Sequence, residues 1–161
     1  MNRVLSVVLL LLALVSAPCV VHAGLDLDKA VKIGSGKTMV IEFTDPDCPY
    51  CRKGSAYFHN RKDLTRYVIL NPLPMHPDAR LKAQYILSSP DKAKAYAEVM
   101  SGKFDGKKPD ADAINREGIQ LLEEHQAMAK ESTAGSTPTF IIFGRIIQGF
   151  DQHQMEGLLG K

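Results

Sequence analysis

A strand-like segment in the first third of this chain runs directly into a pair of closely spaced cysteines. Residues 39–44 read M-V-I-E-F-T, a run of β-branched and aromatic side chains that predicts a buried strand. Cys48 and Cys51 follow almost at once, in the segment C-P-Y-C. Pro49 suits the first turn of a helix, where its missing N–H is not needed, and the helix is predicted to continue over 52–60. The two cysteines are therefore expected where a strand gives way to a helix.

A cysteine pair at such a junction has a specific chemistry. The N-terminus of a helix presents unpaired N–H groups and a partial positive charge, which favour the thiolate form of Cys48. The thiolate is the species that attacks a disulfide. Cys51 lies one helical turn later, so we expect it to be more buried and to attack the resulting mixed disulfide. The spacing thus predicts a nucleophilic thiol followed by a resolving thiol.

Structural roles explain the cysteine pair less well. A disulfide across C-x-x-C closes a very small loop and removes little entropy from the unfolded chain. A zinc site would need two further ligands, but no other cysteine follows residue 23 and the later histidines lack the paired spacing of a zinc site. We expect no metal and no cofactor, and we interpret each histidine as a surface or core residue, with His125 in the core. The histidines are His59, His76, His125 and His153.

The first 23 residues predict a secretory signal peptide. A positively charged residue precedes an apolar run over 4–15, and small residues lie around a cleavage site after Ala23. The run is shorter than the ~20 apolar residues that cross a bilayer. A retained membrane anchor and lipid attachment at Cys19 are the alternatives. We expect an exported, periplasmic protein with its mature domain at 24–161.

Composition limits the other classes of function. The chain has 161 residues, of which 45% are hydrophobic, which suits one domain with a real core. The formal net charge is only +2, and no dense run of Lys and Arg is present. Nucleic-acid binding therefore has little support.

The remaining periodicities predict a mixed α/β architecture. The predicted helices lie at 25–33, twice within 78–101, at 114–128 and at 152–159. The predicted strands, besides 39–44, lie at 66–70, 139–143 and 146–148. Together they give a mixed four-stranded sheet flanked by helices, with the helices of the middle third as an insertion.

Two segments resemble the signatures of a known family. The sequences F-T-D-P-D-C-P-Y-C at 43–51 and G-S-T-P at 135–138 resemble thioredoxin-fold proteins, particularly periplasmic disulfide isomerases of the DsbC/DsbG type. The similarity extends over roughly 39–159. It implies a thioredoxin-like fold and a redox-active disulfide between Cys48 and Cys51.

The resemblance also implies a substrate groove. In that family the threonine–proline bond is cis and its loop packs beside the reactive cysteines, which here places Thr137 and Pro138 next to Cys48. A cis proline exposes the backbone of the preceding residue for pairing with an extended peptide. Thr137 and Pro138, with Tyr50, are therefore expected to bind substrate proteins that carry cysteines. A membrane redox partner that oxidises or reduces the pair is the other expected partner.

Two departures from the family bear on function. Its isomerases have a separate N-terminal dimerisation domain, for which only about fifteen residues remain here before the first predicted strand. We therefore expect a monomer. The second departure is Glu42, where thioredoxins and DsbA-type oxidases have a buried acid but the isomerases tend to be apolar. A buried Glu42 would relay a proton to or from Cys51, whereas an edge-facing Glu42 would simply be exposed.

The sequence thus predicts an exported thiol:disulfide interchange enzyme that acts on protein cysteines as an isomerase, oxidase or reductase. A non-catalytic thioredoxin-fold chaperone or assembly factor, which would bind extended peptides without turnover, is the main alternative. A glutaredoxin is a third, disfavoured because export would remove it from the glutathione-rich cytosol.

Overall fold

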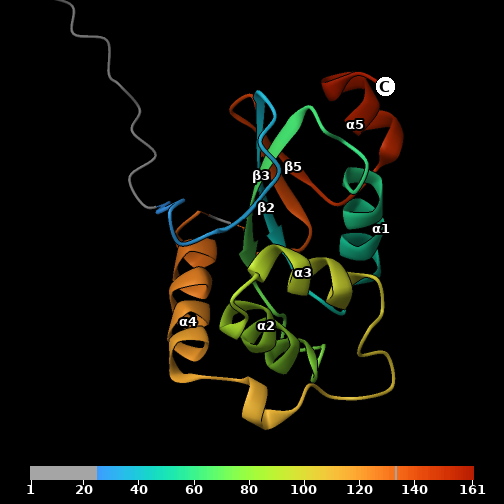
Figure 1. Cartoon of the computed structure of the whole chain (residues 1–161). Helices are drawn as coiled ribbons and strands as arrows, with labels where there is room; N and C mark the ends of the chain where they lie inside the picture. The colour runs from blue at the N-terminus through green and yellow to red at the C-terminus, as the bar shows by residue number, and fades with distance from the viewer. Residues whose placement is uncertain (1–24, 133) are drawn as a thin grey trace, which may run out of the picture.

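The computed structural model describes residues 25–132 and 134–161, which form an α/β sandwich around a five-stranded sheet (Figure 1). The strands are β1 (Val31–Ile33), β2 (Thr38–Thr44), β3 (Leu64–Leu70), β4 (Thr139–Ile142) and β5 (Arg145–Gln148). The helices are α1 (Pro49–Phe58), α2 (Ala79–Ser88), α3 (Lys92–Met100), α4 (Arg116–Glu131) and α5 (Gln152–Leu159), with a 3-10 turn at Ala111–Ala113. The predicted signal peptide lies outside the described residues.

The sheet has the order β1-β3-β2-β4-β5. The central strand β2 pairs in parallel with β3 and antiparallel with β4, so the sheet is mixed, as predicted. The mixed α/β architecture and the four predicted strands are confirmed, but the count of four is wrong because β1 adds a fifth.

The prediction of a helix over 25–33 is wrong. Only a turn forms there, in which the Lys29 N–H donates to the Asp26 carbonyl at 3.2 Å. The chain then extends as β1 and pairs antiparallel with β3, Val31 opposite Val68. The edge of β3 offers unpaired backbone groups, and Val31 buries its side chain there to 2% exposure. Tertiary pairing therefore overrides the weak local helix propensity.

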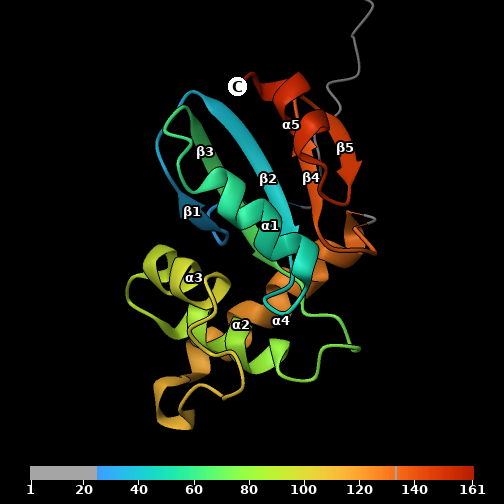
Figure 2. The ribbon, with the colours of Figure 1, turned by 90° about the vertical axis from the view of Figure 1, so that its right-hand side faces the viewer.

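Helices cover both faces of the sheet (Figures 1 and 2). Phe58 of α1 and Met155 of α5 pack with Val40 and Phe140 on one face. On the other face α4 packs Met128 into a separate cluster with strand residues that include Phe43. Alternate residues of β2 thus serve both cores, as a central strand requires.

The insertion between β3 and β4 lies at the end of the sheet where β2 ends and α1 begins (Figure 2). Helices α2 and α4 approach each other very closely at Gly118, which has no side chain. A Cβ at this position would lie only 2.1 Å from the Ser88 hydroxyl oxygen. The Asn115 side chain caps α4 by accepting the Gly118 N–H at 2.8 Å. Within the described residues, no helix is both long enough and apolar enough to cross a bilayer.

Candidate active site

The structure places Cys48 where the strand-to-helix junction was predicted. Cys48 is the N-cap residue of α1, with an extended backbone (φ −73°, ψ 122°), and Pro49 opens the helix. The Cys48 N–H donates to the Asp45 carbonyl at 3.2 Å, and its own carbonyl accepts the first helical bond from the Arg52 N–H at 3.1 Å. The thiol therefore lies at the positive end of the helix.

The two thiols differ in their surroundings. Cys51 is fully buried, whereas Cys48 retains 6% of its surface, and both are free thiols in this structure. The Asp45 N–H donates to the Cys51 sulfur at 3.3 Å. Burial raises the pKa of the Cys51 thiol above its ordinary range, although the nearby Thr44 side chain and the hydrogen bond from the Asp45 N–H oppose that shift. Cys51 is thus held protonated beneath a more accessible partner.

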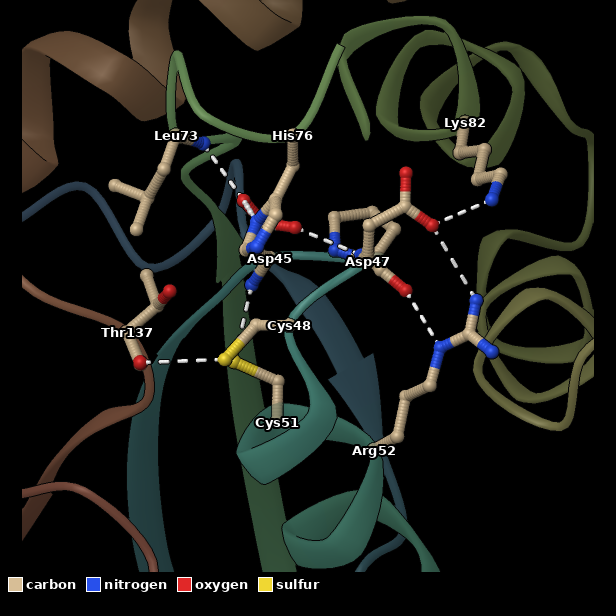
Figure 3. Close-up of polar contacts among 10 residues, drawn as sticks. Asp45, Asp47, Cys48, Cys51, Arg52, Leu73, His76, Lys82 and Thr137 are labelled. Carbon is tan, nitrogen blue, oxygen red and sulfur yellow. Dashed lines mark hydrogen bonds and ion pairs between the residues drawn. The ribbon is translucent and has the colours of Figure 1, made fainter. Parts of the chain in front are cut away.

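The second signature segment lies beside the cysteines, although 89 residues separate Thr137 from Cys48. The Thr137–Pro138 peptide bond is cis, as the resemblance implied. The Cys48 thiol donates to the Thr137 carbonyl at 3.4 Å (Figure 3). Tyr50 is 57% exposed, and the Lys53 amino group lies 5.3 Å from the centroid of its ring. The structure therefore brings Cys48, Cys51 and Thr137 together and leaves Tyr50 at the surface.

Glu42 is buried, which excludes the exposed alternative. Its carboxylate accepts hydrogen bonds from the Arg66 guanidinium at 2.6 and 3.2 Å and from the Tyr96 hydroxyl at 3.1 Å. Burial and the nearby Glu42 charge both raise the pKa of Tyr96. Among the described residues, no direct hydrogen bond joins Glu42 to Cys51. The ion pair with Arg66 was not predicted, although the two side chains lie on adjacent strands, with Val40 opposite Arg66.

Asp45 is a site residue that the sequence analysis missed. Its carboxylate is fully buried and accepts the Asp47 N–H at 2.7 Å, the Leu73 N–H at 2.7 Å and a contact from His76 Nδ1 at 2.9 Å (Figure 3). His76, interpreted from sequence as an ordinary surface or core residue, therefore touches the residue whose backbone contacts both cysteines. No local pattern signalled this, because the contact depends on how the proline-rich loop after β3 closes.

Charged side chains surround the outer side of the site. Asp47 accepts from Lys82 and, at 3.3 Å, from Arg52, which also contacts Asp105 at 2.7 Å. Together with His76 these residues line a cleft of about 540 Å³ next to Pro49. Within residues 25–132 and 134–161, no group of three or more His, Cys, Asp or Glu is arranged to hold a metal ion.

Comparison with known proteins places this geometry in a family. The model of the thioredoxin-like domain matches residues 25–159. A crystal structure of a disulfide interchange protein from Neisseria gonorrhoeae is 33% identical, with a TM-score of 0.69 over 83% of this chain and 94% of that one. The catalytic domain of Proteus mirabilis ScsC, at 20% identity, has the same fold, with a TM-score of 0.65 over 81% of this chain and 87% of that one.

Curated relatives agree. A probable thiol:disulfide interchange protein DsbC from Bordetella avium is 34% identical over 118 residues, which are 71% of this chain and 39% of the relative. Its counterpart from Bordetella pertussis is 27% identical over 139 residues, 84% of this chain and 47% of the relative. This chain thus spans less than half the length of these relatives. It is a member of the thioredoxin-like family and, within that family, of the DsbC-like thiol:disulfide interchange proteins.

Proposed function

We propose that this protein exchanges disulfides with other proteins through Cys48 and Cys51, after export to the periplasm. The observation that carries the proposal is the placement of Cys48 at the start of α1, with its thiol 3.4 Å from the Thr137 carbonyl. A substrate chain that pairs with the Thr137 backbone would bring its own sulfur to Cys48. The relatives described above are disulfide interchange proteins, which supports the same chemistry.

The exchange takes place in two balanced steps. The Cys48 thiolate attacks one sulfur of a substrate disulfide, which forms a mixed disulfide and releases the other substrate sulfur as a thiolate. Cys51 then loses its proton and attacks the Cys48 sulfur. This step closes the Cys48–Cys51 disulfide and frees the second substrate thiol. Run backwards, the same steps oxidise a substrate dithiol, and attack by the released thiol on another substrate disulfide gives isomerisation.

Glu42 is proposed to assist the second step by relaying the proton of Cys51. Burial of the Cys51 thiol makes this proton hard to lose, so a nearby acceptor would speed resolution. Tyr96 is the candidate residue to carry the proton between Cys51 and Glu42. Its hydroxyl donates to Glu42 at 3.1 Å, and a charge on Cys51 raises its pKa. Replacement Glu42→Gln should slow release of the mixed disulfide but leave its formation unchanged in stopped-flow measurements. Equal rates of release would remove Glu42 from the reaction.

Refolding of a scrambled disulfide-bonded protein tests the proposal. Cys48→Ser should abolish activity, and Cys51→Ala should accumulate mixed disulfides through Cys48 that mass spectrometry identifies. Tyr50→Ala should mainly weaken substrate binding, as a raised KM. Refolding by Cys48→Ser at the wild-type rate would support the non-catalytic chaperone instead.

The reduction potential assigns the physiological direction. Known members of this chemistry extend from about −270 mV for reductants to about −120 mV for strong oxidants. A redox titration against glutathione places the protein on that scale. Sequencing of the N-terminus after expression in a Gram-negative host tests export, with Gly24 expected as the first residue.

Trapping in cells addresses the partners. The Cys51→Ala variant should retain both substrate proteins and the membrane redox partner as mixed disulfides on Cys48. A trapped set without any membrane protein would contradict the expected redox partner.

A further inference from the structure

We propose that His76 is a positioning residue for the cysteine pair: it holds the Asp45 carboxylate, keeps the Asp45 N–H on the Cys51 sulfur, and thereby stabilises the dithiol form. This inference rests on the proposed exchange function, because it concerns the redox balance of the same two thiols. His76 comes from the loop between β3 and α2, outside both signature segments.

Asp45 is the connection between His76 and the cysteines. Its backbone N–H donates to the Cys51 sulfur at 3.3 Å, and its carbonyl accepts from the Cys48 N–H at 3.2 Å. The residue therefore touches both halves of the C-x-x-C segment through its main chain. A shift of the Asp45 main chain therefore alters the hydrogen bond from its N–H to the Cys51 sulfur.

The Asp45 side chain determines where that main chain lies. One carboxylate oxygen accepts the Asp47 N–H at 2.7 Å, which shapes the turn into Cys48. The other accepts the Leu73 N–H at 2.7 Å and meets His76 Nδ1 at 2.9 Å. Since the carboxylate is fully buried, no solvent can replace a lost partner without rearrangement.

The direction of the His76 hydrogen bond follows from the acceptor. Both Asp45 oxygens already accept from backbone N–H groups, so the role that suits Nδ1 of His76 at this carboxylate is that of a donor. The side chain of His76 is 23% exposed and lines the cleft beside Pro49. One end of the ring thus holds Asp45, while the ring borders the space next to the reactive cysteine.

The chemistry sets the direction of the effect. The disulfide and two glutathione molecules give the dithiol and one glutathione disulfide, with two electrons and two protons transferred. A thiol or thiolate sulfur accepts the Asp45 N–H better than a disulfide sulfur does, so this hydrogen bond favours the dithiol side. Loss of His76 loosens that bond and leaves the buried carboxylate less compensated beside the sulfurs, which disfavours the thiolate. Both effects shift the equilibrium toward the disulfide.

The test compares two variants of His76 by glutathione titration, alkylation and mass spectrometry. His76→Leu should shift the equilibrium toward the disulfide by about tenfold, which corresponds to ~30 mV. His76→Asn, whose amide N–H can take the place of Nδ1–H, should stay within about twofold of wild type, given the size of one hydrogen bond. The exposed His59→Leu is the matched control. An equilibrium for His76→Leu within that same twofold range would overturn the proposal.

A measurement on the wild-type protein guards against misfolding of the variants. With ¹⁵N-labelled histidine, the His76 Nδ1 resonance should show a bound proton in the dithiol form and should move when the disulfide forms. An unprotonated Nδ1, or a resonance unmoved by oxidation, would contradict the proposal. Neither experiment uses a protein substrate. If both support the role of His76 but the refolding assay fails, the exchange function is rejected and the role of His76 is not.

Discussion

Two buried carboxylates lie three residues apart in the sequence, and their hydrogen-bond partners are of opposite kinds. Glu42, within β2, is held by the Arg66 and Tyr96 side chains from β3 and α3. Asp45, just past the end of β2, is held by backbone N–H groups and one histidine of a loop. The first cluster joins regular elements through the core, whereas the second joins the turn that leads into Cys48 to the loop after β3.

This contrast separates control of stability from control of the thiol–disulfide equilibrium. Removing one partner of a buried ion pair leaves an uncompensated charge in the core, so the Glu42 cluster should mainly affect folding. The Asp45 cluster contacts both cysteines through its main chain, so it should mainly affect redox behaviour. Variants at each cluster can separate these two effects.

The largest effect on stability is expected for Arg66→Met. This change leaves the Glu42 carboxylate buried with only the Tyr96 hydroxyl, and should lower the free energy of unfolding by about 3–5 kcal/mol. Urea unfolding followed by circular dichroism measures the loss.

The double variant Glu42→Met with Arg66→Met is its control. Since both charges are removed, more than half of the lost stability should return. If this neutral pair shifted the glutathione equilibrium as far as Asp45→Asn does, the Glu42 cluster would control redox behaviour as well as folding.

A smaller loss of stability is expected for Asp45→Asn. The amide can accept at one oxygen only and turns an NH₂ group toward a backbone donor, which should lower the free energy of unfolding by about 2 kcal/mol. The same variant should shift the glutathione equilibrium toward the disulfide through the loosened Asp45 N–H bond, but less far than His76→Leu, because the carboxylate charge that disfavours the thiolate is also removed. Asp28→Asn, at an exposed position, is the control. An unchanged equilibrium in folded Asp45→Asn would place redox control elsewhere.

His125 extends the comparison to a buried polar group far from the thiols along the chain. Its Nδ1 accepts the Leu70 N–H at 3.0 Å and its other nitrogen meets the Lys29 carbonyl at 2.9 Å, while burial lowers its pKa from the ordinary 6.5. In the unfolded chain His125 binds a proton more readily, so its contribution is complete above pH 6.5 and declines as the pH falls below that value.

Unfolding experiments between pH 7 and 5 measure this decline. His125→Gln keeps a donor and an acceptor but does not titrate, so its stability should depend less on pH. Parallel pH profiles for wild type and His125→Gln would contradict the assignment.

The smallest effect is expected for Lys82→Met: the lysine itself is buried, but its partner Asp47 lies at the partly exposed rim of the site. Methionine keeps the apolar stem, and Asp47 retains Arg52 as a partner, so the free energy of unfolding should fall by only ~1 kcal/mol. A loss as large as that of Arg66→Met would show that the rim is as important for folding as the core cluster.

Much of the fold and the reactive pair could be predicted from the sequence, because the signals are local. The period of β2, Pro49 after Cys48 and the hairpin near the C-terminus are each encoded within a few residues. The cis bond before Pro138 followed from family resemblance. The burial of His125 followed from helical periodicity.

The rest depends on contacts between distant segments. β1 forms because the edge of β3 is available for pairing. No pattern within residues 25–33 predicts that pairing. The Arg66 partner of Glu42 requires the register of two strands, and the His76 partner of Asp45 requires the closure of a loop 31 residues further on. Such partners have no sequence pattern of their own.

A redox titration of the mature protein shows whether Cys48 and Cys51 form a reversible disulfide. The reduced protein is equilibrated in glutathione buffers of increasing potential, alkylated and analysed by mass spectrometry. A single two-electron transition to an intramolecular Cys48–Cys51 disulfide, between about −270 and −120 mV, is the predicted result. Two thiols that stay free, or that only become glutathionylated across the whole range, would contradict it.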